Sequence, residues 1–180
     1  MRHADIWAWV DTRERPLPWR GERDAYRILV SEVMLQQTQA SRVVPFYEGF
    51  CERFPDVESL AAAAPADVLR EWSSLGYPRR AMNLWRAARS IVERGSFPST
   101  VDDLVTLAGV GPYTARAIAS FAFDVDVAAV DANVKRVVAR FHGVTDGVQA
   151  LADALVPTGK AAAWNQAMID LGAEVCTARS

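Results

Sequence analysis

The stretch LAGVGPYTARAIASFAF, from Leu107 to Phe123, decides the fold of this chain because it joins a short glycine turn to an apolar helix. Gly109 and Gly111 permit a tight turn whose backbone N–H groups point outward where the next helix begins. A helix N-terminus attracts anions, so this turn can hold a phosphate without help from a lysine. A plain pair of antiparallel helices with glycines for close packing would show the same pattern. The glycine turn therefore leaves phosphate binding and simple packing both open.

Apolar residues recur at spacings of three and four through most of the chain, and alternating β-branched runs are scarce. This periodicity predicts an all-helical protein, with Pro and Gly residues at the breaks. The expected helices are Asp5–Asp11, Tyr26–Thr38, Arg42–Arg53, Pro65–Ser73, Arg79–Arg94, Val101–Leu107, Tyr113–Phe123, Ala132–Phe141, Val148–Leu155 and Ala161–Val175.

Composition narrows the class of protein. With 180 residues, of which 51% are hydrophobic and 23% charged, the chain is an ordinary globular protein rather than a disordered one. No apolar run is long enough for a membrane span, and the N-terminus does not resemble a secretion signal, so we expect a cytoplasmic protein. The net charge of −2 argues against indiscriminate polyanion binding. Only Lys135 and Lys160 are lysines, which favours bidentate arginine contacts to phosphate, although a GC-rich genome gives the same bias.

Two acidic residues stand in contexts that suit bond cleavage at a sugar carbon. Asp131, in AVDANVKRV, precedes a helical pattern, so its carboxylate would cap the helix and be stabilised in its charged form by the dipole. Glu32, in ILVSEVML, is flanked by apolar residues, which should raise its pKa. Such a pair can protonate a leaving group and stabilise an oxocarbenium-like centre. Asp131 can also be a simple cap, and Glu32 can pair with an arginine or with Tyr113.

Two further polar segments suit contacts with nucleic acid. Gln36 and Gln37 belong to the cluster QQTQ, whose amides can bond base edges or occupy a vacated stack. In LGYPRR, Tyr77 lies beside the guanidinium groups of Arg79 and Arg80, which suits stacking and phosphate contact. Glutamines at a helix end are also ordinary solvated residues, so neither segment is decisive by itself.

Taken together, several motifs resemble the helix-hairpin-helix DNA glycosylases, and within them the A/G-specific adenine glycosylases of the MutY family. The motifs are LPWRG at Leu17–Gly21, SEVMLQQTQ at Ser31–Gln39, LGYPRRAMNL at Leu75–Leu84, LAGVGPYTARA and VDANVKRVVAR, and the resemblance extends from Trp7 to Arg179. It implies an all-α fold with two helical lobes around a central cleft. Residues 21–126 would form a six-helix lobe that contains the helix-hairpin-helix, and residues 1–20 with 127–180 a discontinuous second lobe.

The resemblance also implies a function in base excision repair. The protein would flip adenine mispaired with 8-oxoguanine or guanine out of double-stranded DNA and hydrolyse its N-glycosidic bond, with little or no AP lyase activity. We expect it to act as a monomer near the nucleoid and away from membranes. Two alternatives stay open. The sequence Asp-Ala-Asn at 131–133 is shared with T/G-mismatch thymine glycosylases of the same superfamily, and a DNA-binding helical module without catalysis would retain the same motifs.

Site residues follow from the matching motifs. Glu32 matches the general acid, Asp131 the carboxylate that stabilises the sugar cation, and Asn133 an asparagine close to that aspartate. Tyr113 stands where bifunctional relatives carry a Schiff-base lysine, which predicts a monofunctional enzyme. The residues matched to DNA contact are Gln36, Gln37, Tyr77, Gly109, Val110 and Gly111.

Cys176 matches one of four cysteines that hold a [4Fe–4S] cluster in the family. One thiolate cannot hold such a cluster, so we expect no cofactor in this chain as given and an unused Cys176. Three further cysteines and a C-terminal domain that reads 8-oxoguanine would lie beyond Ser180. Truncation is the favoured explanation, and a protein that dispenses with the cluster is the alternative.

Overall fold

The computed structural model describes residues 3–13 and 16–178, and the regular structure in them is helical throughout, which confirms the expected all-α class. No helix in these residues has both the length and the apolar character that a bilayer crossing requires. The elements are α1 (His3–Val10), α2 (Ala25–Leu35), α3 (Ala40–Arg53), α4 (Val57–Ala62), α5 (Pro65–Trp72), the 3₁₀ turn η1 (Ser73–Leu75), α6 (Pro78–Arg94), α7 (Val101–Leu104), α8 (Pro112–Phe123), α9 (Ala132–His142), α10 (Val148–Ala154) and α11 (Ala161–Glu174).

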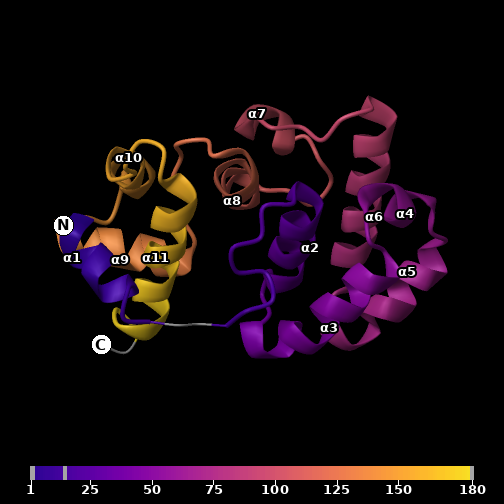
Figure 1. Ribbon diagram of the computed structural model, residues 1–180, viewed down its shortest axis with the longest axis horizontal. Coiled ribbons are helices and arrows are strands. Elements are labelled where there is room, and N and C mark those ends of the chain that lie inside the picture. The colour runs from indigo at the N-terminus through magenta and orange to yellow at the C-terminus, as the bar shows by residue number, and fades with distance from the viewer. Residues whose placement is uncertain (1–2, 14–15, 179–180) are drawn as a thin grey trace. The chain divides into compact units, whose positions relative to one another are not determined.

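The chain divides into two compact units, Leu17–Phe123 and Met1–Pro16 with Asp124–Ser180. We call them the continuous unit and the split unit. The continuous unit contains α2 to α8 with η1, and the split unit contains α1 and α9 to α11 (Figure 1). The sequence motifs predict lobes at 21–126 and at 1–20 with 127–180. In both divisions the N-terminal helix groups with the C-terminal helices.

Helix α2 is the central helix of the continuous unit, because it packs against α3, α6 and α8. Its residues from Ile28 to Met34 are all buried, and Leu29, Val30 and Met34 have no exposed surface. A helix surrounded on several sides loses its polar face, which explains why this segment reads as a nearly continuous apolar run. Asp24 begins the helix, since its side chain accepts a hydrogen bond of 2.8 Å from Arg27 N.

The split unit is built on α9 and α11, which pack against each other, while α10 covers α9 and α1 covers α11. Trp164 on α11 is 2% exposed and makes edge-to-face contacts with the rings of His3 and Trp7 on α1. These contacts join the N-terminal helix to the C-terminal part of the chain. The buried core consists of Ile6, Ala128, Val134, Val137, Val138, Val148, Ala152, Trp164, Ala167 and Met168.

The structure differs from the sequence prediction at two helices, α4 and α2. Helix α4 was not predicted, because its six residues are too short to show a periodicity. A capping box between Asp56 and Ser59 begins it. Helix α2 ends at Leu35 and not at Thr38, since Gln36 leaves the helical region (ψ 115°) and Gln37 adopts a positive φ of 56°.

Removal of the α2 cap should lower stability. We expect Asp24→Ala to cost about 1 kcal/mol, because the N–H group of Arg27 loses its acceptor, and Asp24→Ser to cost less because serine also caps. Urea denaturation at fixed temperature measures both changes. An alanine variant as stable as the parent would contradict this account of how α2 begins.

Candidate functional site

The C-terminal end of α2 is tied directly to the glycine turn. Gln36 Nε2 donates a hydrogen bond of 3.2 Å to the carbonyl oxygen of Gly109. Gln37 follows in a left-handed conformation and its side chain is exposed. The structure therefore brings two segments that the sequence matched to DNA contact together within the continuous unit.

The two glycines of the turn have different structural roles. Gly109 has a φ of +79°, and a Cβ at this position would lie 2.7 Å from the Cβ of Asn83 on α6. Gly111 is exposed, lacks a positive φ, and a Cβ there would meet no atom within 4 Å. Gly109 thus shapes the turn and packs it on α6, whereas Gly111 leaves an open stretch of backbone at the start of α8. Val110, between them, is 6% exposed and anchors the turn to the core.

Tyr77 is the most exposed aromatic residue of the described chain, with 58% of its surface accessible. It has a φ of +50°, which is a strained conformation for a residue with a bulky side chain. Its neighbour Gly76 also has a positive φ, of 73°, and its carbonyl accepts a hydrogen bond of 3.0 Å from Trp72 Nε1. The turn before α6 therefore presents an aromatic ring to solvent on a fixed backbone. Arg79, the next predicted contact residue, is exposed as well.

Arg80 has a different role from Arg79, and sequence reasoning missed it. Its guanidinium donates hydrogen bonds to carbonyl groups of α2 and of the turn before α6, so it is not a free phosphate ligand. Burial lowers the pKa of the Arg80 guanidinium, although arginine remains protonated at neutral pH. The sequence does contain a signal that Arg80 is partly buried and Arg79 is not. Arg80 lies four residues before Leu84, on the stripe of α6 that is buried, whereas Arg79 lies off it.

Asp131 caps α9 with one carboxylate oxygen and binds a side chain with the other. Oδ1 accepts a hydrogen bond of 2.7 Å from Val134 N, and Oδ2 accepts one of 2.9 Å from Asn133 Nδ2. The predicted cap is therefore present. The two bonds hold the half-buried carboxylate in one orientation at the positive end of the helix dipole.

Asn133 is itself held by Arg136, which lies one turn further along α9, and it packs against Gly172 of α11. Arg136 Nη2 donates a bond of 2.9 Å to Asn133 Oδ1, which leaves the amide N–H₂ group to face Asp131. Arg136 also donates to the carbonyl groups of Gly172 and Cys176. Gly172 permits this close packing, since a Cβ there would lie 2.6 Å from Asn133 Cβ. The orientation of Asp131 therefore depends on Asn133 and, through it, on Arg136, all within the split unit.

The remaining predicted residues divide between the two units. Glu32 is 7% exposed on α2, as its apolar neighbours indicated, and Tyr113 is half-buried in the first turn of α8, a helix that packs against α2. The continuous unit holds Glu32, Gln36, Gln37, Tyr77, Arg79, Gly109, Val110, Gly111 and Tyr113, and the split unit holds Asp131, Asn133 and Cys176.

The described residues do not fit a [4Fe–4S] cluster. Cys176 follows α11 and its Sγ lies 3.4 Å from Arg140 Nη1, while Cys51 is buried in the other unit. Across residues 3–13 and 16–178, no group of three or more His, Cys, Asp or Glu side chains could hold a metal ion.

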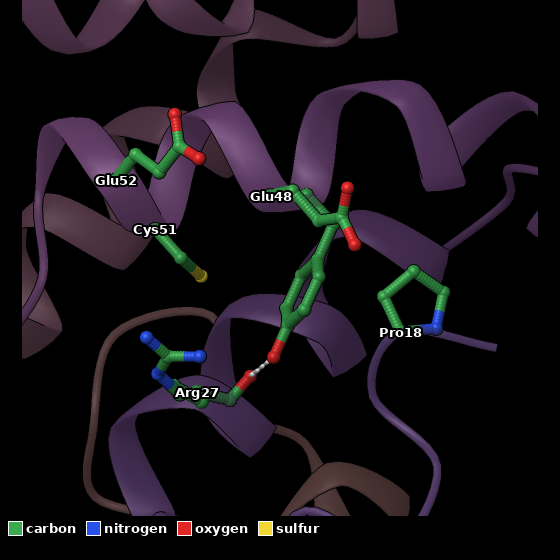
Figure 2. A pocket seen from close by; sticks show the side chains of 6 residues that line it. Pro18, Arg27, Glu48, Cys51 and Glu52 are labelled. Carbon is green, nitrogen blue, oxygen red and sulfur yellow. Dashed lines mark hydrogen bonds between the residues drawn. The ribbon is translucent and has the colours of Figure 1, made fainter.

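A hollow of about 250 Å³ lies elsewhere in the continuous unit, on α3 and the residues next to it (Figure 2). It is lined by Pro18, Arg27, Tyr47, Glu48, Cys51 and Glu52, none of which was a predicted site residue. Tyr47 Oη donates a bond of 3.4 Å to the carbonyl of Arg27. Burial raises the pKa of the Cys51 thiol to about 11, so it is not a nucleophile at neutral pH.

Comparison with known proteins gives one family. Residues 30–156 match the HhH-GPD superfamily of base excision DNA repair proteins. The chain is 46% identical to the adenine DNA glycosylase of Mycolicibacterium smegmatis over an alignment of 187 positions, gaps included. The alignment covers 98% of this chain and 64% of that protein. For the adenine DNA glycosylase of Homo sapiens the identity is 40%, with 97% of this chain and 36% of the relative covered. The chain thus spans less than two thirds of the length of these relatives.

Solved structures of similar fold include a thermostable thymine-DNA glycosylase. It superposes with a TM-score of 0.90 at 29% identity and covers 98% of this chain and 87% of its own. A non-covalent endonuclease III–DNA complex superposes with a TM-score of 0.84 at 23% identity, covering 98% and 85% of the two chains, which shows a common fold.

The two glycines of the turn should respond differently to alanine. Gly109→Ala should destabilise the protein by about 2–4 kcal/mol, because it combines a left-handed backbone with a clash against Asn83. Gly111→Ala should change stability by no more than about 0.5 kcal/mol, since its Cβ would meet open space. Thermal unfolding of the matched pair provides the measurement. Equal destabilisation by both substitutions would refute this distinction.

Proposed function

The chain belongs to the HhH-GPD superfamily of base excision DNA repair proteins, and we propose that it is a monofunctional DNA glycosylase that removes adenine mispaired with 8-oxoguanine or guanine. The observation that carries the proposal is the similarity to adenine DNA glycosylases along 98% of the chain. Double-stranded DNA with such a mispair is the proposed partner. In this proposal the protein acts as a monomer, close to the nucleoid in the cytoplasm.

The proposed chemistry uses two carboxyl groups and water. Glu32, buried on α2, protonates a ring nitrogen of the flipped adenine, so that the base leaves as the bond to C1′ breaks. Asp131, held by Val134 N and Asn133 Nδ2, stabilises the positive charge that develops on the sugar. Water then adds to C1′ and its proton passes to the Glu32 carboxylate, which restores the acid and completes the hydrolysis. These steps need no cofactor, and a [4Fe–4S] cluster would need three cysteines besides Cys176.

The continuous unit supplies the proposed grip on DNA. The N–H group of Val110 donates to Leu107 O, so we assign the phosphate to the N–H groups of Gly109 and Gly111, and the open space at Gly111 lets that phosphate approach closely. The exposed ring of Tyr77 can enter the stack beside the mispair, and Gln36 and Gln37 can bond the exposed base edges. Arg79 is placed to contact a phosphate near Tyr77.

A second candidate function is removal of thymine from T:G mispairs. The structural match to a thymine-DNA glycosylase favours it, as does Ala132 in the sequence Asp-Ala-Asn. Purine departure benefits from protonation by Glu32, whereas thymine is a better leaving group. The two functions therefore differ in how much they need this acid.

Base release under single-turnover conditions tests the function on A:8-oxoguanine, A:G and T:G duplexes. We expect release from the two adenine duplexes and a loss of about 10²-fold or more in Glu32→Gln and in Asp131→Asn. Asn remains a good cap, so Asp131→Asn should stay folded. Asp56→Asn, at another helix cap, is the matched control and should keep the parent rate.

Other outcomes identify the alternatives. Release from T:G alone, with Glu32→Gln as fast as the parent, would replace adenine with thymine as the substrate. Binding to all three duplexes without release by the parent chain would support a non-catalytic module. An Asp131→Asn variant as active as the parent would exclude the proposed mechanism.

Strand cleavage should be weak or absent, because Tyr113 offers no amine for a Schiff base at the position where lyases carry lysine. Borohydride added during turnover on the A:G duplex should trap no more than a trace of protein–DNA adduct. The abasic product should break only after alkali treatment. Trapping in stoichiometric yield would contradict the assignment of a monofunctional enzyme.

A further inference from the structure

We propose that Arg80 is a positioning residue that holds two strained turns, at Gln36–Gln37 and at Gly76–Tyr77, as one rigid surface for unstacking the target base pair. The inference rests on the proposed function and deepens it. It concerns how the protein prepares the DNA before any bond is broken.

One side of the Arg80 guanidinium binds the end of α2. Nη1 donates hydrogen bonds to Val33 O (3.2 Å), Met34 O (3.0 Å) and Gln36 O. The last carbonyl groups of a helix lack partners within the helix and carry partial negative charge. A cation with several N–H groups is suited to this place, so Arg80 completes the C-terminus of α2.

The other side of the guanidinium binds the residues that precede α6. Nη2 donates to Leu75 O (3.2 Å) and, more weakly, to Gly76 O (3.5 Å), and it also reaches Thr38 Oγ1 (3.0 Å). The guanidinium carbon lies over two rings, 5.1 Å from the centroid of Tyr77 and 5.7 Å from that of Trp72. One side chain therefore bridges both turns and contacts the exposed ring directly.

The Arg80 hydrogen bonds lie next to two residues with unusual backbone conformations. Gln37 and Tyr77 both adopt positive φ values, 56° and 50°, although neither is glycine. Such conformations cost about 1–3 kcal/mol and persist where surrounding contacts hold them. Arg80 bonds the carbonyl of Gln36, and it lies 3.5 Å from the carbonyl of Gly76, which accepts a shorter bond of 3.0 Å from Trp72 Nε1. These are the peptide groups immediately before the two strained residues. Arg80 thus fixes the peptide plane before Gln37 and, together with Trp72, the one before Tyr77.

A lysine could not replace this arrangement. An ammonium group has three donors on a flexible stem, whereas the Arg80 guanidinium is a planar fork that donates through both Nη groups and stacks on aromatic rings, while its buried Nε has no hydrogen-bond partner among the described residues. The bond from Gln36 Nε2 to Gly109 O extends the same rigid surface to the glycine turn. Loss of the Arg80 contacts should therefore loosen the alignment of all three segments.

The test compares Arg80→Lys and Arg80→Met with Arg89→Met. Arg89 lies on the same helix, is exposed, and also stacks on a ring, that of Trp85 at 5.0 Å, so it is a matched control. The first readout is the fluorescence of 2-aminopurine placed at the target adenine opposite guanine, at saturating protein, because its emission rises when the base unstacks. The second is the single-turnover rate of base release from a paired adenine and from an adenine in an unpaired bulge. Circular dichroism confirms that each variant is folded.

We expect Arg80→Lys to lose most of the fluorescence rise and about tenfold or more of the rate on paired adenine, with less than about threefold loss on the bulged adenine. Arg89→Met should match the parent in every readout. Parent-like fluorescence in Arg80→Lys, or equal rate losses on paired and bulged adenine, would overturn the proposal, as would a parent chain that gives no fluorescence rise. A parent that unstacks the base without releasing it would reject the glycosylase function and leave the positioning role in place.

Discussion

The end of α2 imposes the constraint on which the rest of the continuous unit depends. This helix is surrounded by α3, α6 and α8, so its last carbonyl groups need donors from the protein. Arg80 supplies them, and in doing so it joins the α2 terminus to the turn that carries Tyr77. Gln36, released from the helix, turns its amide to the glycine turn. The segments proposed to contact DNA are therefore assembled around a single buried helix end.

In the split unit, hydrogen bonds hold the carboxylate of Asp131 in one orientation. Capping α9 and binding Asn133 occupy both carboxylate oxygens, and Arg136 holds Asn133 against α11. The same carboxylate can therefore stabilise α9 and serve the proposed reaction, because the hydrogen bond that caps the helix also orients the charge. Each of the two proposed catalytic carboxyl groups is positioned by the core of its own unit.

The sequence was informative where a local rule decides the structure. Glycine conformation located the turn at Gly109, and a carboxylate before a helical pattern located the Asp131 cap. It failed where tertiary contacts decide. Glutamine is a good helix former, so nothing local showed that α2 ends at Leu35. Nothing local showed that Arg80, and not Arg79, binds the protein itself, because its acceptors are carbonyl groups more than forty residues away. The buried stripe of α6 nevertheless gave a usable signal.

A structure of this chain bound to a duplex with a non-cleavable adenosine analogue opposite 8-oxoguanine tests the central claim most directly. The account predicts that the adenine is turned out of the helix, and that the Tyr77 ring enters the stack with the Arg80 contacts intact. A backbone phosphate should accept hydrogen bonds from the N–H groups of the glycine turn. An adenine still stacked in the duplex, with DNA bound away from the glycine turn and Tyr77, would contradict it.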